Sequence, residues 1–236
     1  MNVMRTVARK TRPLRRVLTP RQFKETYINE FLKHRADATY IEIGVQAGES
    51  FREVSAVRKV GVDLLRNPAM SQLAPGEEFF EQASDEFFAT AQSSVLSPEG
   101  IDVALVDGLH EFRQALRDVL NLERFMRPDG LIVIDDCNPC TLARAIDSRQ
   151  PGTWNGDVWK VIAFLRSERP DLRTITVDAD QGIGLVTGFH GGASRPTDAM
   201  LRRYKDLDYE ELGRDRRTLL GLVAPASISR LLNTGE

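Results

Sequence analysis

Several features that would define a specialised chain are scarce or missing here. The 236 residues include only two cysteines and three histidines, and the basic and acidic residues nearly balance to a net charge of -2. Proteins that mainly bind nucleic acid normally carry a strong basic excess, so we expect no nucleic-acid partner. No apolar run approaches the length of a membrane span, and residues 1–22 lack the continuous apolar core of a secretory signal. We therefore expect a cytoplasmic protein.

The cysteines are too few for a zinc site of the usual kind. Cys137 and Cys140 stand close together, but such a site would need two more soft ligands, and the histidines at positions 34, 110 and 190 are scattered. Two cysteines three residues apart also suggest redox chemistry. Free, reduced thiols in a loop are the interpretation we favour.

The charge is balanced overall but not along the chain. Seven lysine or arginine residues lie within residues 1–22, ahead of Glu25, the first acidic residue. This basic arm has two open interpretations: contact with an anionic membrane surface or acidic polymer, or a solvated leader without fixed structure.

Two short apolar runs carry the most informative residues. Residues 101–107 and 130–135 read as strands of a parallel sheet with buried centres, and residues 111–126 between them have the apolar spacing of a helix. Neighbouring parallel strands end at the same edge of a sheet, so Asp107, Asp135 and Asp136 should emerge together there. With His110 three residues after the first aspartate, this cluster indicates a divalent-cation site beside a general base. Strand-end carboxylates that cap helices are the alternative.

The remaining elements complete an α/β domain. We expect strands at 40–44, 59–63, 78–82, 172–177 and 182–187, helices at 21–34, 49–57 and 157–169, and a short helix capped by Ser84 and Asp85. Alternating strands and helices followed by a terminal hairpin predict a Rossmann-like sheet of seven mostly parallel strands, one reversed, with helices on both faces. The expected organisation is a basic N-terminal arm and covering helix (1–37), a central domain (38–190) and a C-terminal helical extension (191–236).

The first strand and its turn indicate a nucleotide site. Gly44 and Gly48 follow this strand, and Asp63 ends the next, where a carboxylate can accept hydrogen bonds from both ribose hydroxyls. The spacing is not the one expected for a pyrophosphate. Glu42 beside the turn suits a cationic ligand better than a diphosphate. Taken alone, the glycines require no more than a tight strand-to-helix turn.

Six blocks in order resemble one family, the class I S-adenosylmethionine-dependent methyltransferases, and more narrowly their metal-dependent branch that methylates sugar hydroxyls on macrolides, aminocoumarins and bacterial glycans. The blocks are YIEIGVxxGES (40–50), VGVD (60–63), SDEFF (84–88), DGLHE (107–111), IDDCNP (134–139) and WNGDVWK (154–160). The resemblance covers about residues 38–188 and leaves both ends uncovered.

The resemblance implies roles for particular residues. Glu42, Gly44 and Gly48 would hold the methionine part of the cofactor, Asp63 would hold the ribose, and Ser84 with Asp85 would lie beside the adenine. Ser50 and Asp107 are further cofactor-binding candidates. Asp107, Asp135 and Asp136 would bind Mg²⁺ or Mn²⁺, with His110 as the base and Asp107 also counted as catalytic. Relatives often have His-Asp where this chain has Asp135 and Asp136.

The WNGDVWK block offers candidates for the acceptor site. Trp154 and Trp159 provide flat apolar surface for a sugar face, although Trp159 could equally be a core residue. Asp157 is a candidate helix N-cap. Lys160 either pairs with Asp157 or lines the pocket.

On these grounds we interpret the chain as a metal-dependent O-methyltransferase that acts on a sugar hydroxyl of a saccharide, glycolipid or glycosylated natural product, and we expect a homo-oligomer. A non-sugar hydroxyl such as a catechol is one alternative. A nicotinamide-dependent oxidoreductase is disfavoured by the missing dinucleotide glycine pattern. A non-catalytic assembly subunit docking through its basic arm is disfavoured by the intact aspartates and His110.

Overall fold

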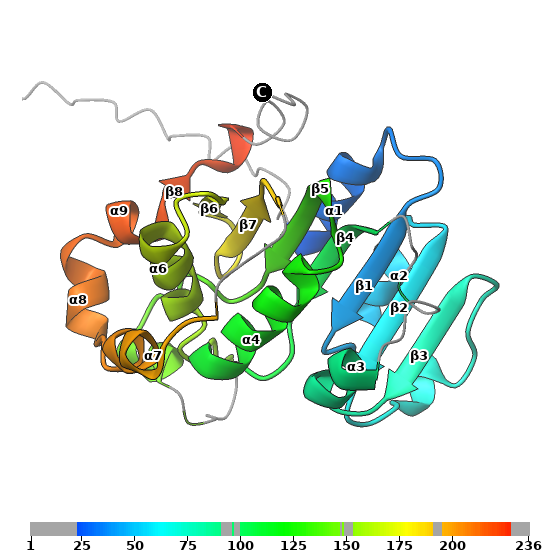
Figure 1. The fold of residues 1–236 in the computed structure, drawn as a ribbon, viewed down its shortest axis with the longest axis horizontal. Coiled ribbons are helices and arrows are strands. Elements are labelled where there is room, and N and C mark those ends of the chain that lie inside the picture. The colour runs from blue at the N-terminus through cyan, green and yellow to red at the C-terminus, as the bar shows by residue number, and fades with distance from the viewer. Residues whose placement is uncertain are drawn as a thin grey trace, which may run out of the picture.

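The structure, a computed structural model, describes residues 23–90, 96, 100–146, 148, 153–190 and 195–227. An eight-stranded sheet in the order β3-β2-β1-β4-β5-β7-β6-β8 runs through its centre (Figure 1). The strands are β1 (Thr39–Ile43), β2 (Arg58–Asp63), β3 (Glu77–Glu81), β4 (Ile101–Val106), β5 (Met126–Ile134), β6 (Arg173–Val177), β7 (Ile183–Thr187) and β8 (Leu222–Val223). Only β7 runs against its neighbours among these described strands. The mostly parallel sheet with one reversed strand is confirmed; the predicted count of seven misses β8.

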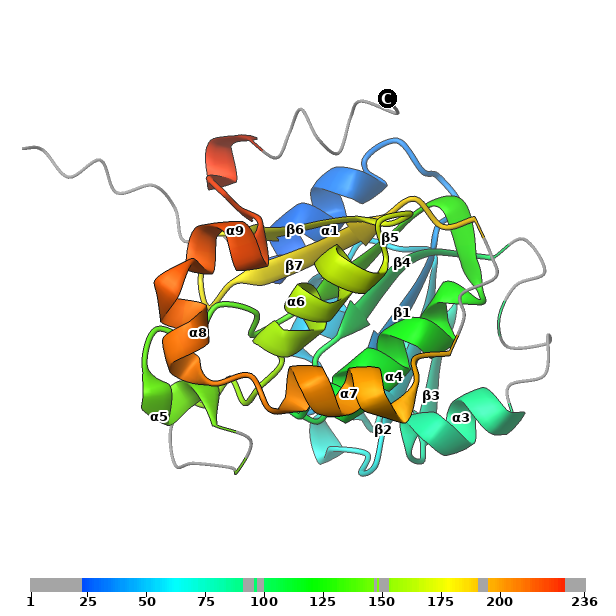
Figure 2. The same ribbon diagram turned by 60° about the vertical axis from the view of Figure 1, so that its left-hand side comes forward.

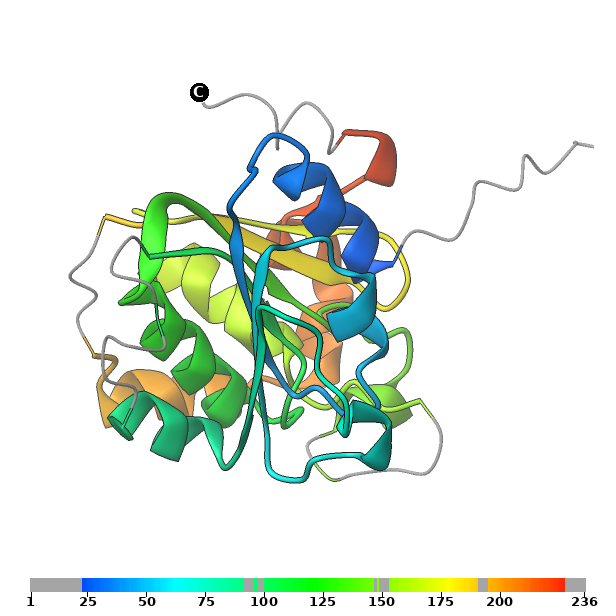
Figure 3. The same ribbon diagram turned by 90° about the vertical axis from the view of Figure 1, so that its right-hand side faces the viewer.

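Helices cover both faces of this sheet, as expected (Figures 2 and 3). One face carries α1 (Lys24–Leu32) and α2 (Glu49–Glu53). The other carries α3 (Ser84–Thr90), α4 (Phe112–Glu123) and α6 (Trp159–Glu168), with α7 (Asp198–Lys205), α8 (Tyr209–Arg214) and α9 (Arg216–Leu220) packed outside. A short α5 (Leu142–Ala145) lies near the end of β5, with 3-10 turns at Pro68–Met70 and Pro225–Ser227.

The central strands β4 and β5 are buried on both faces over residues 103–106 and 131–134, and these segments are therefore apolar. Their side chains alternate between two core clusters. Ala104, Val106, Ile132 and Ile134 pack on the α4 and α6 side, and Val103, Leu105, Leu131 and Val133 pack on the α1 and α2 side. Continued by one residue, this alternation directs the side chains that follow Val106 and Ile134 toward α1.

The described part of the C-terminal extension packs onto the central domain. Tyr204, Leu212 and Leu220 are buried in the same core cluster as α4 and α6. β8 then pairs in parallel with β6 at the edge of the sheet. A strand of two residues leaves no periodic signal in the sequence, which explains why it was not predicted.

Several predicted boundaries shift. The helix expected over 49–57 ends at Glu53, and the strand expected from Gly130 begins at Met126, with a register irregularity between its two ends. Residues 1–22, which include most of the basic arm and the predicted start of the first helix at residue 21, lie outside the described residues. None of the helices within the described ranges has the length and apolar character needed to cross a membrane.

Candidate active site

The carboxylates that were predicted to meet do so because of strand register. Val106 lies opposite Ile134 in the β4–β5 pairing, so the next residues, Asp107 and Asp135, stand side by side. The backbone N–H of Asp107 donates to the Ile43 carbonyl, and that of Asp135 donates to the Val106 carbonyl. The parallel ladder thus continues one residue beyond the strands and fixes both aspartates at its edge.

Lys24, the first residue of α1, lies between these two aspartates. Its Nζ is 2.5 Å from Asp107 Oδ2 and 2.6 Å from Asp135 Oδ2. Burial alone would lower the pKa of this ammonium group, but the two carboxylates outweigh burial and raise the pKa above its usual range. The sequence interpretation did not include Lys24, because nothing local shows that this helix reaches the strand ends.

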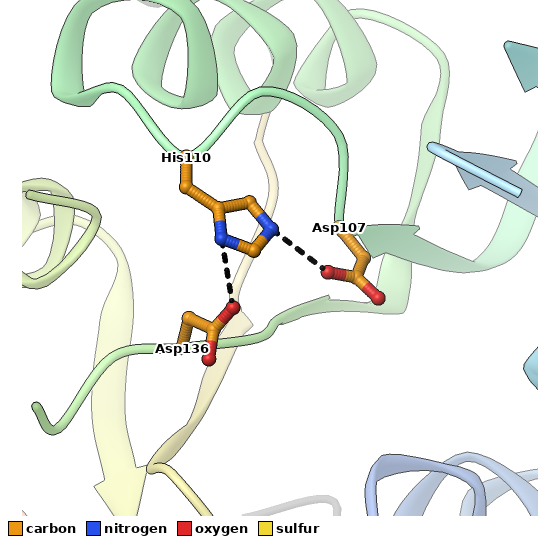
Figure 4. A group of neighbouring side chains, drawn as sticks. All are labelled: Asp107, His110 and Asp136. Atoms are coloured by element: carbon orange, nitrogen blue, oxygen red, sulfur yellow. Dashed lines mark ion pairs between the residues drawn. The ribbon is translucent and has the colours of Figure 1, made fainter. Parts of the chain in front are cut away.

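His110 joins Asp107 to Asp136 (Figure 4). Its Nε2 lies 3.4 Å from Asp107 Oδ1, and its Nδ1 lies 3.1 Å from Asp136 Oδ2 and 2.9 Å from the Trp154 carbonyl oxygen. A carbonyl only accepts hydrogen bonds, so Nδ1 must carry a hydrogen. In the neutral imidazole, Nε2 is therefore the atom that can take up a proton.

The ionisation of this cluster is strongly perturbed. Burial alone would lower the pKa of His110, but the hydrogen bond with Asp107 and the charge of Asp136 raise it to about 9. Burial and the neighbouring Asp135 raise the pKa of Asp136 to about 8. Burial would raise the pKa of Asp107 too, but its bonds to His110 and Lys24 lower it. Perturbation of this kind is typical of functional sites.

The loop over residues 154–157 holds His110 in place. The Trp154 ring stacks on the imidazole at 5.1 Å between centroids, and Asn155 Nδ2 donates to Asp136 Oδ1 at 2.7 Å. Gly156 adopts φ of 62°, and a Cβ there would come within 1.7 Å of the His110 carbonyl oxygen. Only glycine permits this approach.

Two of the predicted acceptor residues do not reach the site. Trp159 is 1% exposed and lies in the core, so it takes the alternative role of a core residue that the sequence also allowed. Lys160 is also buried; its Nζ donates to the Lys205 carbonyl and lies 3.4 Å from Asp157 Oδ2. Asp157 does not cap its own helix, because Val158 is the N-cap of α6. Its Oδ1 instead accepts from the N–H of Phe112 and caps α4. Trp154 is the only one of the three acceptor candidates at the site.

A cavity of about 390 Å³ adjoins Asp107. Of the predicted cofactor residues, its lining includes Gly44, Asp63, Ser84, Asp85 and Asp107. The structure adds Gln46, whose N–H donates to Asp63 Oδ2 at 2.8 Å, and Asp118, which is buried beside Gln114. A Cβ on Gly44 would lie 2.2 Å from the Asp107 carbonyl oxygen, so this close approach requires glycine.

A smaller cavity of about 170 Å³ continues toward α1 and is lined by Lys24, Glu42, Ser50 and Asp107 among others. Glu42 is buried and accepts a hydrogen bond from the Tyr40 hydroxyl at 2.7 Å. Burial raises the pKa of Glu42 to about 8. Ser50 donates to Glu25 of α1. Gly48 lines neither cavity; it adopts φ of 75° as the N-cap of α2.

Two features lie apart from this cluster. A cavity of about 610 Å³ lies against α4 and the start of α7, and its lining contains none of the predicted site residues. Cys137 is buried, Cys140 is exposed, and both are free, as predicted.

The side chains present fit a divalent cation. Asp107, His110 and Asp136 each offer one ligand atom, and these atoms lie within 4.8 Å of one another. Buried Asn155 Oδ1 has no hydrogen-bond partner within the described residues and is a further hard oxygen donor beside Asp136. Asp135, predicted as a third ligand, is instead tied to Lys24.

Comparisons with known proteins give a domain match and a set of similar solved structures. Residues 41–137 match the family model described as a methyltransferase domain. Similar solved structures include an O-methyltransferase from Bacillus cereus in complex with SAH, with a TM-score of 0.52, 13% identity, and coverage of 69% of this chain and 80% of that one. Another is TomG from Streptomyces achromogenes, an O-methyltransferase involved in tomaymycin synthesis, in complex with SAM, with a TM-score of 0.52, 17% identity, and coverage of 70% and 78%. No protein of curated function matches the sequence significantly.

The chain therefore has a methyltransferase fold, and the matched segment contains β1, β2, β4 and β5 with the candidate site at their ends.

Proposed function

We propose that the chain transfers the methyl group of S-adenosylmethionine to a sugar hydroxyl, with a divalent cation at Asp107 and Asp136 and with His110 as the base. One observation carries the proposal: the carboxylate and histidine cluster borders the 390 Å³ cavity through Asp107, and Asp63 lines the same cavity. A nucleoside held at Asp63 would place its reactive end toward the cluster. The sugar as acceptor rests on the resemblance of the sequence blocks and on the Trp154 ring beside His110.

The residues have distinct tasks in this reaction. Asp63 accepts hydrogen bonds from the ribose hydroxyls, and Asp107 provides negative charge near the sulfonium and the methionine amino group. The buried Glu42 carboxyl lies beside Asp107 as a further hydrogen-bonding group for that amino group. As the acceptor oxygen bonds to the methyl carbon, the carbon–sulfur bond breaks and its electron pair stays on sulfur. His110 Nε2 receives the hydroxyl proton. A divalent cation, when bound, supplies positive charge that stabilises the forming alkoxide.

S-adenosylhomocysteine is expected to raise the melting temperature of the protein, because a ligand that binds only the folded state stabilises it. Asp63→Ala should reduce this shift by removing the acceptor of the ribose hydroxyls. Asp37→Ala is the matched control, since Asp37 is exposed and precedes β1 at the opposite edge of the sheet. The measurement is thermal unfolding with increasing ligand.

NAD in place of S-adenosylhomocysteine tests the oxidoreductase alternative. A clear thermal shift with NAD, and none with millimolar S-adenosylhomocysteine, would contradict the proposed function. Turnover is then measured as S-adenosylhomocysteine release with a panel of sugars, glycolipid precursors and catechols. If only catechols were methylated, the methyl-transfer reaction would be supported, and the sugar would be ruled out as its acceptor.

A further inference from the structure

The position of Lys24 raises a question about how an ion would enter the site. Its ammonium group is 2.5 and 2.6 Å from oxygens of Asp107 and Asp135, close to the distances of about 2.3–2.6 Å at which Ca²⁺ binds oxygen and longer than the roughly 2.0–2.1 Å of Mg²⁺. One nitrogen thus already bridges the two carboxylates that parallel register places side by side. The two oxygens are spaced to hold a single cation between them.

The helix that carries Lys24 is firmly attached, but Lys24 itself is at its end. Tyr27, Ile28 and Leu32 are buried in the core cluster on this face, and Asn29 bonds to the end of α2. Lys24 is the first residue of α1, where a cation is unfavourable because the helix dipole places positive charge there. Its four-carbon side chain can rotate away without moving the buried face of α1.

Charge explains why the ammonium group and a divalent ion would exclude each other. Asp107 belongs both to the Lys24 pair and to the cluster with His110 and Asp136. An ion bound to Asp107 would lie within a few ångströms of the ammonium group, and like charges at that distance repel strongly in a partly buried site. If the ammonium group of Lys24 moved away, Asp135, the third aspartate at this edge of the sheet, would also lose its ion pair.

We propose that Lys24 occupies part of the cation site, and that a divalent ion binds by displacing its ammonium group from Asp107 and Asp135. Lys24 then sets the affinity for the ion, because each binding event must break two ion pairs. This inference rests on the proposed function, since it assumes the cation site described above. In this inference Lys24, a residue of α1, determines how tightly the ion is bound, and its ammonium group leaves when the ion binds.

Mn²⁺ titration of the full chain, followed by electron paramagnetic resonance of the free ion, tests this proposal. Lys24→Gln should bind Mn²⁺ at least about tenfold more tightly than the wild type, while Lys24→Arg, which keeps the charge, should stay within about threefold. Lys33→Gln is the control on the same helix; Lys33 is exposed, pairs with Glu30, and its loss should leave affinity unchanged. Equal or weaker binding by Lys24→Gln would overturn the displacement.

A second measurement needs no variant. Acetic anhydride should modify Lys24 slowly in the ion-free protein and several-fold faster at saturating Mg²⁺, while Lys33 reacts equally in both, as read by mass spectrometry of the peptides. Lys24 that stays protected while the ion is bound would also overturn the proposal. If no variant binds Mn²⁺ but S-adenosylhomocysteine still stabilises the protein, the metal requirement itself is wrong and the methyltransferase assignment stands.

Discussion

Removal of divalent cations with EDTA is expected to lower the rate of methyl transfer by about 10²-fold or more, and Mg²⁺ or Mn²⁺ should restore it. A cation at a developing alkoxide contributes several kcal/mol, and about 1.4 kcal/mol corresponds to a factor of ten in rate. Within the described residues, Asp107, Asp135 and Asp136 pair with Lys24 and His110 at this buried edge, so the carboxylates outnumber the paired cations by one.

The site of the ion is checked by Asp136→Asn, which removes one ligand charge while keeping an oxygen that His110 can contact. This variant should need a higher Mg²⁺ concentration for half-maximal rate. Asp129→Asn is the control, because the Asp129 side chain is 63% exposed and contacts Arg35 and Arg127 away from the site. The thermal shift with S-adenosylhomocysteine should persist in EDTA, since Asp63 does not take part in the ion site. Full activity in excess EDTA would contradict the need for a cation, and Lys24 and His110 would then be the positive groups near the acceptor.

The sequence predicted the fold well because its strongest signals are local. Apolar strands with turn residues at their ends identified β4 and β5, and from them the meeting of Asp107 and Asp135 at one edge followed. Because successive side chains of a strand point to opposite faces of the sheet, the three aspartates do not all lie on one face. Asp107 and Asp135 share the face of α1, while Asp136, at φ of 62°, reaches His110 on the other side.

The contacts that the sequence did not predict all join distant elements. The helix containing Lys24 was expected to cover the sheet, and nothing in its apolar pattern identifies the residue that reaches Asp107. A lysine in the first turn, where the helix dipole disfavours it, indicates only that its charge is compensated elsewhere in the fold. Asp157 resembles an ordinary N-cap in sequence, yet it caps α4 from 45 residues away. Tertiary packing decides such contacts.

His110→Ala is expected to lower kcat by about 10²-fold or more. The reason is that Nε2 is the ring nitrogen free to accept the acceptor proton, since Nδ1 donates to the Trp154 carbonyl. Affinity for S-adenosylhomocysteine should stay near that of the wild type, because His110 does not line the cavity beside Asp63. His34→Ala, an exposed histidine just after α1, is the control.

The pH dependence of kcat gives an independent test of the same role. A base must be neutral to accept a proton. The rate should therefore increase as the pH rises through the pKa of His110, and it should be low at pH values below that pKa. Asp107 and Asp136 raise that pKa to about 9 in the ion-free protein, against an unperturbed value of about 6.5. A bound cation offsets the negative charge that raises the pKa of His110. Saturating Mg²⁺ should therefore shift the acidic limb of the pH–rate profile to lower pH, and the imidazole pKa measured by NMR titration should fall with it. A variant with normal kcat but a raised acceptor KM would instead make His110 a substrate-binding residue, and the proton would then pass to an aspartate.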